Sequence, residues 1–296
     1  ALAERGPAVG WDRAPELALL AEANLRAVLG DNRGKICVGD VSEQTPAADD
    51  FWHLDPDRRV EGRRSTQVRW HSPGPEVVER WLTTAPQGVV KLAPAAEVPE
   101  SWQREAELEW VSRDRQCRQL LVWFGELATA PCQHRATALQ TPTDENDPPV
   151  ACGFAGTPGL ATPLVSPVRD YIYDTDPAIR AADLTGALAE QFELGAISSG
   201  ASYLTADRPV EHPLLACFRV VDQLPLREKP LANHLRSLGI GRLEIKKRGV
   251  DHDPERLRRR LKLQGEMSAT LLLTRQGERE IAILAQRCQR KEKLPG

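Results

Sequence analysis

The sequence predicts an α/β fold, in which a parallel sheet flanked by helices is followed by a small α+β domain. In the first third of the chain, short and nearly continuous apolar strands alternate with helical segments, which is the order that builds a parallel sheet. In the second half, helices are mixed with strands, as in an α+β domain. The length of 296 residues is enough for two such domains.

The elements of the first domain follow from apolar runs and their end signals. The first strand, Ala8–Trp11, ends on Asp12. A helix follows, with Pro15 in its first turn, apolar residues at helical spacing, and Gly30 at its end. The next elements are, in order, a strand over Lys35–Val41 that ends on Asp40, a strand over Asp49–Leu54 that ends on Asp55, a helix over Gly74–Pro86 and a strand over Gly88–Pro94.

Three further strands are expected to extend this sheet in the antiparallel direction. Two of them lie within Glu107–Gly125 and are joined by a polar turn at Arg113–Gln116, and the third is Arg135–Gln140. The composition then shifts to Pro, Gly, Thr and acids, which predicts a linker over residues 141–165. The first domain is therefore expected to span residues 1–140.

The second domain is expected over residues 166–296, with a small ferredoxin-like subdomain at 166–200 as an alternative arrangement within it. Periodicity predicts helices at Ala178–Phe192, Pro230–Gly239 and Asp253–Gly265. Strands are expected at Cys217–Leu224, Gly241–Gly249, Ser268–Gln276 and Glu280–Arg287. Helices laid on a mixed sheet would account for this order.

Composition excludes several classes of protein. With 41% hydrophobic and 27% charged residues and no long apolar run, the chain is expected to be soluble and not to cross a membrane. The net charge of −3 gives no overall basic field, so any attraction to nucleic acid must come from a local patch. The six scattered cysteines lack metal-ligand spacing, so neither a metal site nor a disulfide framework is expected. A cytoplasmic location is expected for the same reason.

Polar residues follow the strands of the first domain, at the edge where parallel sheets bind ligands. Asp12 is placed to accept the hydroxyls of a ribose, or else to cap the helix. Asp40 fits a position near a base, or else a turn. Pro56 fixes the turn after Asp55, so that Asp55 and the Pro56 carbonyl would point into a cleft, or else simply reverse the chain. Lys91 would contact a substrate phosphate or cap its strand.

Two basic stretches are candidates for binding nucleic-acid phosphates. Arg58, Arg59, Arg63 and Arg64 follow Asp55-Pro56, where a solvated loop is the alternative. The stretch Arg242–Lys262 is a second candidate, with an exposed helix face as its alternative. Few aromatic residues accompany it, so recognition of phosphate and shape is expected rather than base stacking. Its candidate binding residues are Lys246, Lys247, Arg248 and Arg259.

The runs "AVGWDRAPELALLAEANLRAVL", "FWHLDPDRR", "VVKLAPA" and "RLEIKKRGVDHDPERLRRRLKLQGEMSATLLLTR" resemble bacterial S-adenosylmethionine-dependent methyltransferases with a C-terminal THUMP-like domain. The resemblance covers essentially the whole chain. It implies a Rossmann-like class I methyltransferase fold, S-adenosylmethionine as methyl donor, and RNA, such as tRNA or rRNA, as partner. It also implies that Asp12 holds the ribose, that Asp40 and Val41 approach adenine, and that Asp55-Pro56 face the transferred methyl group.

Two departures from the family pattern affect these expectations. The family's first strand and glycine-rich turn are expected before Ala1, so this sequence is expected to begin inside the domain, and whether it is itself an active enzyme stays open. The only glycine-rich stretch, Gly153–Gly159, contains Pro and is expected to follow no strand. Asp57-Arg58 stand where amino-methylating relatives carry an aromatic residue, so the methylated atom is not predicted. A non-catalytic RNA-binding protein on the same scaffold is the alternative function.

Overall fold

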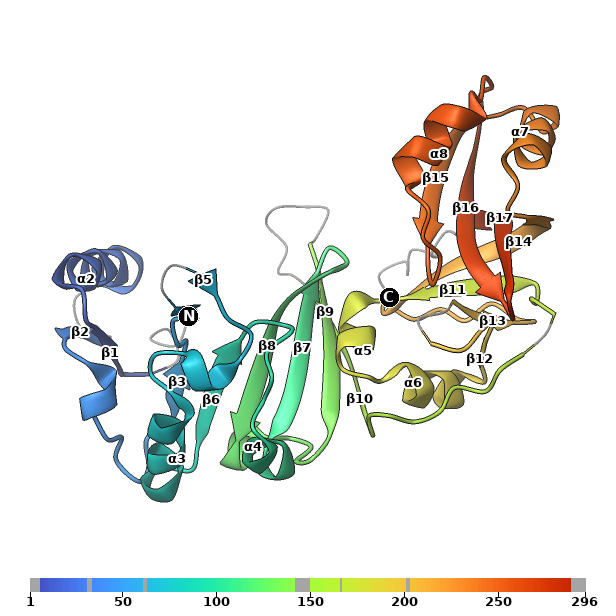
Figure 1. The fold of residues 1–296 in the computed structure, drawn as a ribbon. Helices are drawn as coiled ribbons and strands as arrows, with labels where there is room; N and C mark the ends of the chain where they lie inside the picture. Colours follow the sequence, from blue (N-terminus) through green and yellow to red (C-terminus); the bar gives the residue numbers. More distant parts are fainter. Residues whose placement is uncertain are drawn as a thin grey trace, which may run out of the picture. The chain divides into compact units, whose positions relative to one another are not determined.

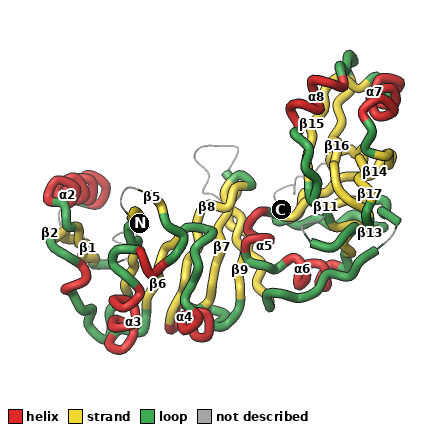
Figure 2. Tube along the Cα trace, viewed as in Figure 1, coloured by secondary structure: helices red, strands yellow, loops and turns green. Residues whose placement is uncertain are grey.

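The structure of the protein is a computed structural model. It describes residues 6–30, 34–60, 63–141, 150–165, 167–200 and 203–288, except for the side chains of residues 60, 63 and 64. The chain forms two compact units (Figures 1 and 2). The first unit comprises Ala1–Leu92, Ala96–Glu105 and Val122–Thr129, and the second comprises Ala93–Ala95, Ala106–Leu121 and Ala130–Gly296.

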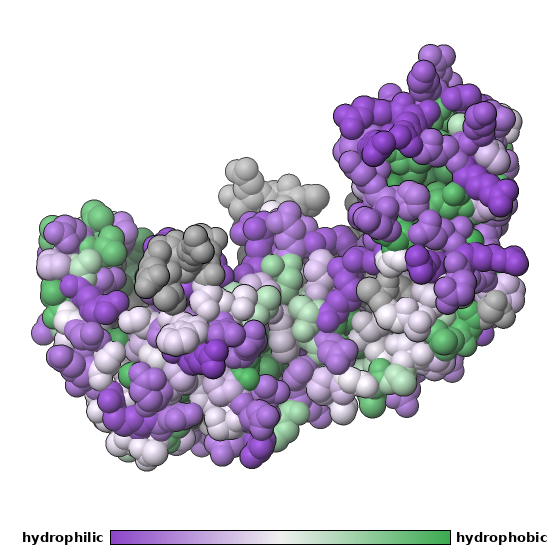
Figure 3. All heavy atoms as spheres, viewed as in Figure 1, coloured by the Kyte–Doolittle hydropathy of each residue, from purple (hydrophilic) through white to green (hydrophobic). Residues whose placement is uncertain are grey.

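The first unit opens with the predicted strand, helix and strand. Strand β1 (Ala8–Asp12) pairs in parallel with β2 (Gly34–Val38), and Asp12 lies opposite Val38. Helix α2 (Pro15–Leu29) connects them and ends at Gly30, whose φ of 75° suits glycine. Four apolar side chains of α2 are exposed, namely Leu17, Leu19, Leu20 and Val28. Apolar surface is accordingly visible over this helix in Figure 3.

The rest of the first unit packs around aromatic residues. Strand β3 (Trp52–Leu54) pairs in parallel with β6 (Gly88–Leu92), and a Cβ at Gly88 would lie 2.1 Å from the Trp52 ring, so this crossing requires glycine. Trp81 and Phe124 also contact Trp52. The remaining elements of this unit are η1 (Val41–Glu43), β4 (Arg59–Val60), β5 (Arg63–Arg64), η2 (Val68–Trp70), α3 (Pro75–Thr84), α4 (Glu100–Glu105) and η3 (Gly125–Leu127).

Strands β7 (Glu107–Arg113) and β8 (Gln116–Phe124) form the predicted hairpin, with Asp114 and Arg115 at positive φ in the two-residue turn. Strand β9 (His134–Gln140) pairs in parallel with β7, so the expectation of a wholly antiparallel extension is wrong. The long connection from β8 lets β9 pair with β7 instead of forming a hairpin with β8. The strand order of this sheet is β10-β9-β7-β8-β6-β3.

The stretch predicted as a linker contains a strand, which corrects that prediction for residues 150–156. Strand β10 (Val150–Gly156) pairs antiparallel with β9 along its whole length. It carries two of the glycines in the Gly153–Gly159 stretch, which therefore begins within a strand. Pro, Gly and Thr are common in linkers, but backbone pairing with β9 satisfies this segment's polar groups. Residues 142–149 of the predicted linker lie outside the described residues.

A second large sheet, of seven strands, lies in the second unit. Its strand order is β12-β13-β11-β14-β17-β16-β15. Strands β15 and β16 are parallel, and the other described pairs in this sheet are antiparallel. These strands are β11 (Tyr171–Thr175), β12 (Gly195–Ala196), β13 (Leu204–Ala206), β14 (Leu215–Pro225), β15 (Ile240–Lys247), β16 (Met267–Gln276) and β17 (Arg279–Arg287).

The helices of the second unit cover this sheet in the pattern that alternation predicts. Helices α7 (Glu228–Ser237) and α8 (Pro254–Leu261) pack on the face that carries Leu271 and Leu273 of β16, whereas Leu272 joins the core of the other face. The single helix predicted at Ala178–Phe192 is two helices, α5 (Pro177–Ala181) and α6 (Thr185–Phe192). Asp183, at a φ of 55°, interrupts the helical backbone between them.

Candidate functional site

Asp12 and Asp40 lie at the carboxyl edge of the parallel pair β1 and β2. The Asp12 Oδ1 accepts a hydrogen bond of 2.8 Å from the Ala14 amide, just before α2. The Asp40 Oδ1 accepts one of 2.8 Å from the Ser42 amide, and its other oxygen lies 3.8 Å from Arg13. The Ser42 hydrogen bonds, with Arg13, lower the pKa of Asp40, so this carboxylate is ionised at neutral pH. Val41, the third predicted residue, begins η1.

Helix α3 positions the loop that carries Asp40 and Val41. The indole of Trp81, which is buried, donates a hydrogen bond of 2.8 Å to the Gln44 carbonyl, and Arg80 donates to the carbonyls of Ser42 and Gln44. These contacts satisfy the Ser42 carbonyl within η1 and the Gln44 carbonyl just after it. The geometry of the Asp40 loop therefore depends on a helix about 40 residues further along the chain.

Asp55 and Lys91 meet at the carboxyl edge of β3 and β6. The Lys91 Nζ lies 2.5 Å from the Asp55 Oδ2, and both side chains are partly exposed. Pro56 is buried, which fixes the turn behind the carboxylate. The structure thus places Asp55 and Lys91 together. Lys91, on the neighbouring strand β6, holds the Asp55 carboxylate through an ion pair.

His53 is a residue of this edge that the sequence prediction missed. It lies two residues before Asp55 on the exposed face of β3, the spacing at which side chains share a strand face. Burial lowers the pKa of His53, and the Lys91 charge lowers it further, against an opposing effect of Asp55. His53 is therefore neutral at pH 7 and available as a hydrogen-bond partner beside the Asp55–Lys91 pair.

The arginines after Asp55-Pro56 lie on a short hairpin of the first unit. Arg58 is half-buried, and Arg59 is exposed at the start of β4, which pairs with β5. Asp57 and Ser72 exchange two backbone hydrogen bonds of 2.8 Å each, which tie the start of this hairpin to the segment before α3. Arg63 and Arg64 form β5, and their side chains are among those outside the described set.

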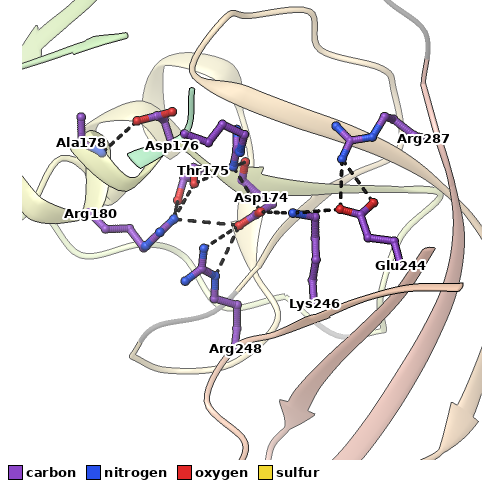
Figure 4. A network of polar contacts seen from close by, with 10 residues as sticks. Asp174, Thr175, Asp176, Ala178, Arg180, Glu244, Lys246, Arg248 and Arg287 are labelled. Carbon is purple, nitrogen blue, oxygen red and sulfur yellow. Dashed lines mark hydrogen bonds and ion pairs between the residues drawn. The ribbon is translucent and has the colours of Figure 1, made fainter. Parts of the chain in front are cut away.

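A polar network in the second unit is centred on Asp174 of β11, which is 4% exposed (Figure 4). Two guanidinium groups contact its carboxylate, from Arg248 at 2.9 Å and from Arg115 at 3.1 Å. Lys246 lies 3.5 Å and Arg180 3.9 Å from it. Four cations from three separate regions of the chain therefore surround one carboxylate.

The Asp174 network carries excess positive charge. Burial alone would raise the pKa of Asp174, but the charges of Arg248 and Arg115 outweigh burial and lower it. Burial, together with the neighbouring Arg248, lowers the pKa of Arg180 to about 10, so it remains charged at neutral pH. Glu244 adds a second acid, which pairs with Lys246 and with Arg287. Sequence reasoning identified Lys246 and Arg248 but missed Asp174, Arg115 and Arg180.

A cavity of about 830 Å³ in the second unit borders the network. Arg115 and Asp176 line it at one side and Arg287 contributes to it from β17. Asp176 caps α5 through a hydrogen bond of 2.9 Å from the Ala178 amide, so its carboxylate has a structural partner. The cavity is therefore lined by polar and apolar side chains and lies beside a surplus of cations.

Lys247 and Arg259, the other two residues predicted in this region, lie at the end of β15 and in the last turn of α8. Asp253 caps this helix by accepting hydrogen bonds from the Arg256 and Glu255 amides. The Arg256 hydrogen bond is the main cause of its lowered pKa, and the charges of Arg259 and Lys247 contribute. The charges of Lys247 of β15 and Arg259 of α8 therefore both act on the Asp253 carboxylate.

Within the described residues, no group of three or more His, Cys, Asp or Glu side chains is placed to hold a metal ion. The same part of the chain contains no helix that is long and apolar enough to span a membrane.

Comparison with known proteins places the chain in a family. Residues 215–287, which contain β14 to β17 with α7 and α8, match the THUMP domain-like family. Two proteins from strains of Mycobacterium tuberculosis, each described as an uncharacterized S-adenosylmethionine-dependent methyltransferase, are 32% identical over 274 residues, covering 91% of this chain and 72% of theirs.

The fold is also that of a solved structure from Porphyromonas gingivalis W83, which is described as a methyltransferase. The TM-score is 0.76 at 19% identity, over 96% of this chain and 72% of that one. Likeness at this identity shows the fold alone, and it agrees with the parallel strands described above. On the relatives' identity and coverage, the chain belongs to the S-adenosylmethionine-dependent methyltransferases that carry a C-terminal THUMP-like domain.

Proposed function

We propose that this protein binds S-adenosylmethionine and methylates RNA. The observation that carries the RNA substrate is the Asp174 network, in which four cations surround one buried carboxylate next to a domain that matches the THUMP-like family. Surplus cations held in fixed positions suit the phosphates of a polyanion. With a net charge of −3 overall, the chain attracts RNA through such local clusters.

The carboxyl edge of β1 and β2 fits the nucleoside part of the cofactor. A carboxylate offers about four acceptor sites, and the Ala14 amide occupies one at Asp12, so Asp12 retains capacity for both ribose hydroxyls. Asp40, ionised and held by Ser42, would accept from the adenine amino group, and Val41 would contact the ring. Both carboxylates lie at the strand ends, where α/β sheets bind ligands.

Asp55 and Lys91 are the residues proposed to act on the acceptor. When bound, the cofactor supplies a methyl group on a positively charged sulfur, which needs no further activation. The protein's task is then to orient the acceptor atom and receive its proton. Asp55 would accept that proton, and Lys91, 2.5 Å away, would hold the carboxylate in place. Arg58 and Arg59 would bind phosphates next to the acceptor.

Calorimetric titration of the protein with S-adenosylhomocysteine tests the cofactor site. We expect Asp12→Asn to weaken binding at least about tenfold, because charge-assisted hydrogen bonds to hydroxyls are lost. The matched control is Glu16→Gln, an exposed acid in the first turn of α2, which should bind like the wild type. A wild-type protein that does not bind S-adenosylhomocysteine would overturn the proposed activity.

Methyl transfer from radiolabelled cofactor to fractionated cell extract tests the substrate class. We expect label in the RNA fraction, lost after ribonuclease treatment, and no label in protein. Label that resists ribonuclease but not protease would reject an RNA substrate while leaving the methyltransferase assignment in place. The alternative function, a non-catalytic RNA-binding protein, predicts RNA binding without any affinity for S-adenosylhomocysteine.

A further inference from the structure

Trp70 is an exposed aromatic residue within a basic part of the first unit. It lies in η2 and is 55% exposed. Arg69 precedes it, and Arg58 and Arg59 lie on the hairpin that the Asp57–Ser72 backbone pair joins to this segment. An indole ring that is exposed and fixed beside cations is available to a ligand that stacks and carries negative charge.

Two neighbouring side chains hold the Trp70 ring in place. The indole nitrogen donates a hydrogen bond of 2.9 Å to the Gln67 Oε1. Arg69 donates one of 2.8 Å to the same oxygen, and its guanidinium carbon lies 5.3 Å from the centre of the indole ring. Gln67 therefore fixes the ring with the guanidinium lying over it, an arrangement that we call the Trp70 platform (Gln67, Arg69 and Trp70).

The backbone under the platform is anchored on both sides. His71 is 6% exposed, and its Nε2 lies 3.1 Å from the Ser65 carbonyl oxygen. Val68 is 3% exposed and belongs to the core of the first unit. Ser72 exchanges two backbone hydrogen bonds with Asp57, two residues from Asp55. The segment that carries the platform is thus tied, through Ser72 and Asp57, to the chain that leaves the strand end proposed to receive the acceptor.

We propose that the Trp70 platform stacks on an unpaired base of the RNA substrate. This inference rests on the proposed function, and it adds base stacking to a site otherwise recognised by charge. Every base has a π-face that an indole ring can stack on, and an adjacent arginine supplies charge for the phosphate. A single aromatic ring among arginines suits an unpaired nucleotide as its ligand. A protein partner would instead be expected to cover a broader apolar patch.

The platform also accounts for a departure from the family pattern, the lack of an aromatic residue after Asp55-Pro56. Asp57 and Arg58 stand after Asp55-Pro56, and neither is aromatic. Pairing of Asp57 with Ser72 brings an aromatic residue to this region from a segment more than ten residues further along the chain. The stacking surface is therefore supplied by tertiary structure, where the local motif does not provide it.

Binding of single-stranded oligoadenylate, and of an abasic oligomer with the same number of phosphates, tests this proposal in the full-length protein. We expect Trp70→Ala to weaken oligoadenylate binding about tenfold, because stacking on one base is lost. Binding of the abasic oligomer should not change. Trp70→Phe should restore most of the affinity, since a phenyl ring still stacks. The salt dependence should stay the same in all three proteins, because no charge is removed.

Phe51→Ala is the matched control, because Phe51 is 65% exposed at the amino end of β3 and should not affect binding. Equal binding of oligoadenylate by the wild type and by Trp70→Ala would overturn the platform. So would an equal loss for the abasic oligomer, which would indicate a structural effect. Neither result would affect the proposed methyl transfer to RNA, which the labelling of fractionated extract tests separately.

Discussion

Asp174 carries one buried carboxylate that serves two roles in the second unit. It links the end of β15, helix α5 and the turn between β7 and β8 through Arg248, Arg180 and Arg115. It also holds these cations close together, which their mutual repulsion would otherwise oppose. Removing the carboxylate should therefore affect both stability and the geometry of the proposed phosphate site.

We expect Asp174→Asn to destabilise the second unit by about 3 kcal/mol, because a neutral amide leaves buried cations without their counter-charge. Urea unfolding followed by far-UV circular dichroism measures this. Tryptophan fluorescence would report mainly on the first unit, because six of the seven tryptophans lie in it. Asp170→Asn, an exposed acid just before β11, is the control and should leave the free energy of unfolding unchanged. Equal stability of the two variants would contradict a central role for Asp174.

The same residue predicts a pH dependence. The pKa of Asp174 is lower in the folded state than the value of about 4 expected when unfolded. Its contribution to stability is therefore complete above the unfolded pKa and is lost as the pH falls through the folded one. The difference in free energy of unfolding between the wild type and Asp174→Asn should shrink below pH 4. A difference that stays constant down to pH 2 would argue against the ion pairs as its source.

Asp55 provides a second prediction at this scale, and it concerns catalysis. Loss of a proton acceptor that is positioned by Lys91 should lower kcat about 100-fold in Asp55→Asn, while binding of S-adenosylhomocysteine stays unchanged. Steady-state methylation of the identified RNA would measure this. Asp50→Asn, an exposed acid at the amino end of β3, is the control. Unchanged kcat in Asp55→Asn would remove this residue from the mechanism.

At the scale of elements, β15 begins where two backbone segments cross closely. A Cβ at Gly241 would lie 1.8 Å from the Gly265 carbonyl oxygen, and one at Gly265 would lie 2.1 Å from the Gly239 carbonyl oxygen. Glycine at both positions lets β15 enter the sheet parallel to β16, with Ile240 opposite Met267. This approach helps to position the strand whose far end carries Lys246 and Lys247.

We expect Gly241→Ala to destabilise the second unit by about 2 kcal/mol, because the methyl group must displace backbone atoms rather than a flexible side chain. Chemical denaturation followed by circular dichroism would detect this change. The control is Gly153→Ala in β10, where the nearest atom to an added Cβ is 3.4 Å away and φ is not positive. Similar stabilities for the two variants would show that the crossing can relax.

At the scale of the whole molecule, a chain with net charge −3 is proposed to bind a polyanion. This requires charge to be segregated, and the structure shows clusters of cations at the ends of strands and in the last turn of α8. Acids elsewhere on the surface would then repel RNA from other faces and favour one orientation of binding. RNA affinity should therefore depend strongly on a few cations and on salt concentration.

We expect Lys247→Ala combined with Arg259→Ala to weaken RNA binding and to lower the slope of log K against log salt by about 2, because two phosphate contacts are lost. Fluorescence anisotropy at several salt concentrations measures both quantities. Lys229→Ala, an exposed cation at the start of α7, is the control and should leave the slope unchanged. An unchanged slope in the double variant would remove Lys247 and Arg259 from the interface.

Much of the fold could be predicted because its signals are local. Helix α2 has Pro at its start and Gly after its end, and the parallel strands end on polar residues as expected. The break at Asp183 and the strand within the predicted linker were missed. Both depend on a backbone conformation or a strand partner that residue composition does not reveal.

The sequence by itself determined the α/β class, the family resemblance and the carboxyl-edge residues Asp12, Asp40, Asp55 and Lys91, because local periodicity and the ends of strands carry this information. Only the tertiary structure decided that Arg115 and Arg180 join Lys246 and Arg248 around Asp174, and that the segment after Trp70 pairs with Asp57. These residues are far apart along the chain. Their meeting depends on sheet order and packing, which are set by contacts over the whole unit rather than by any short motif.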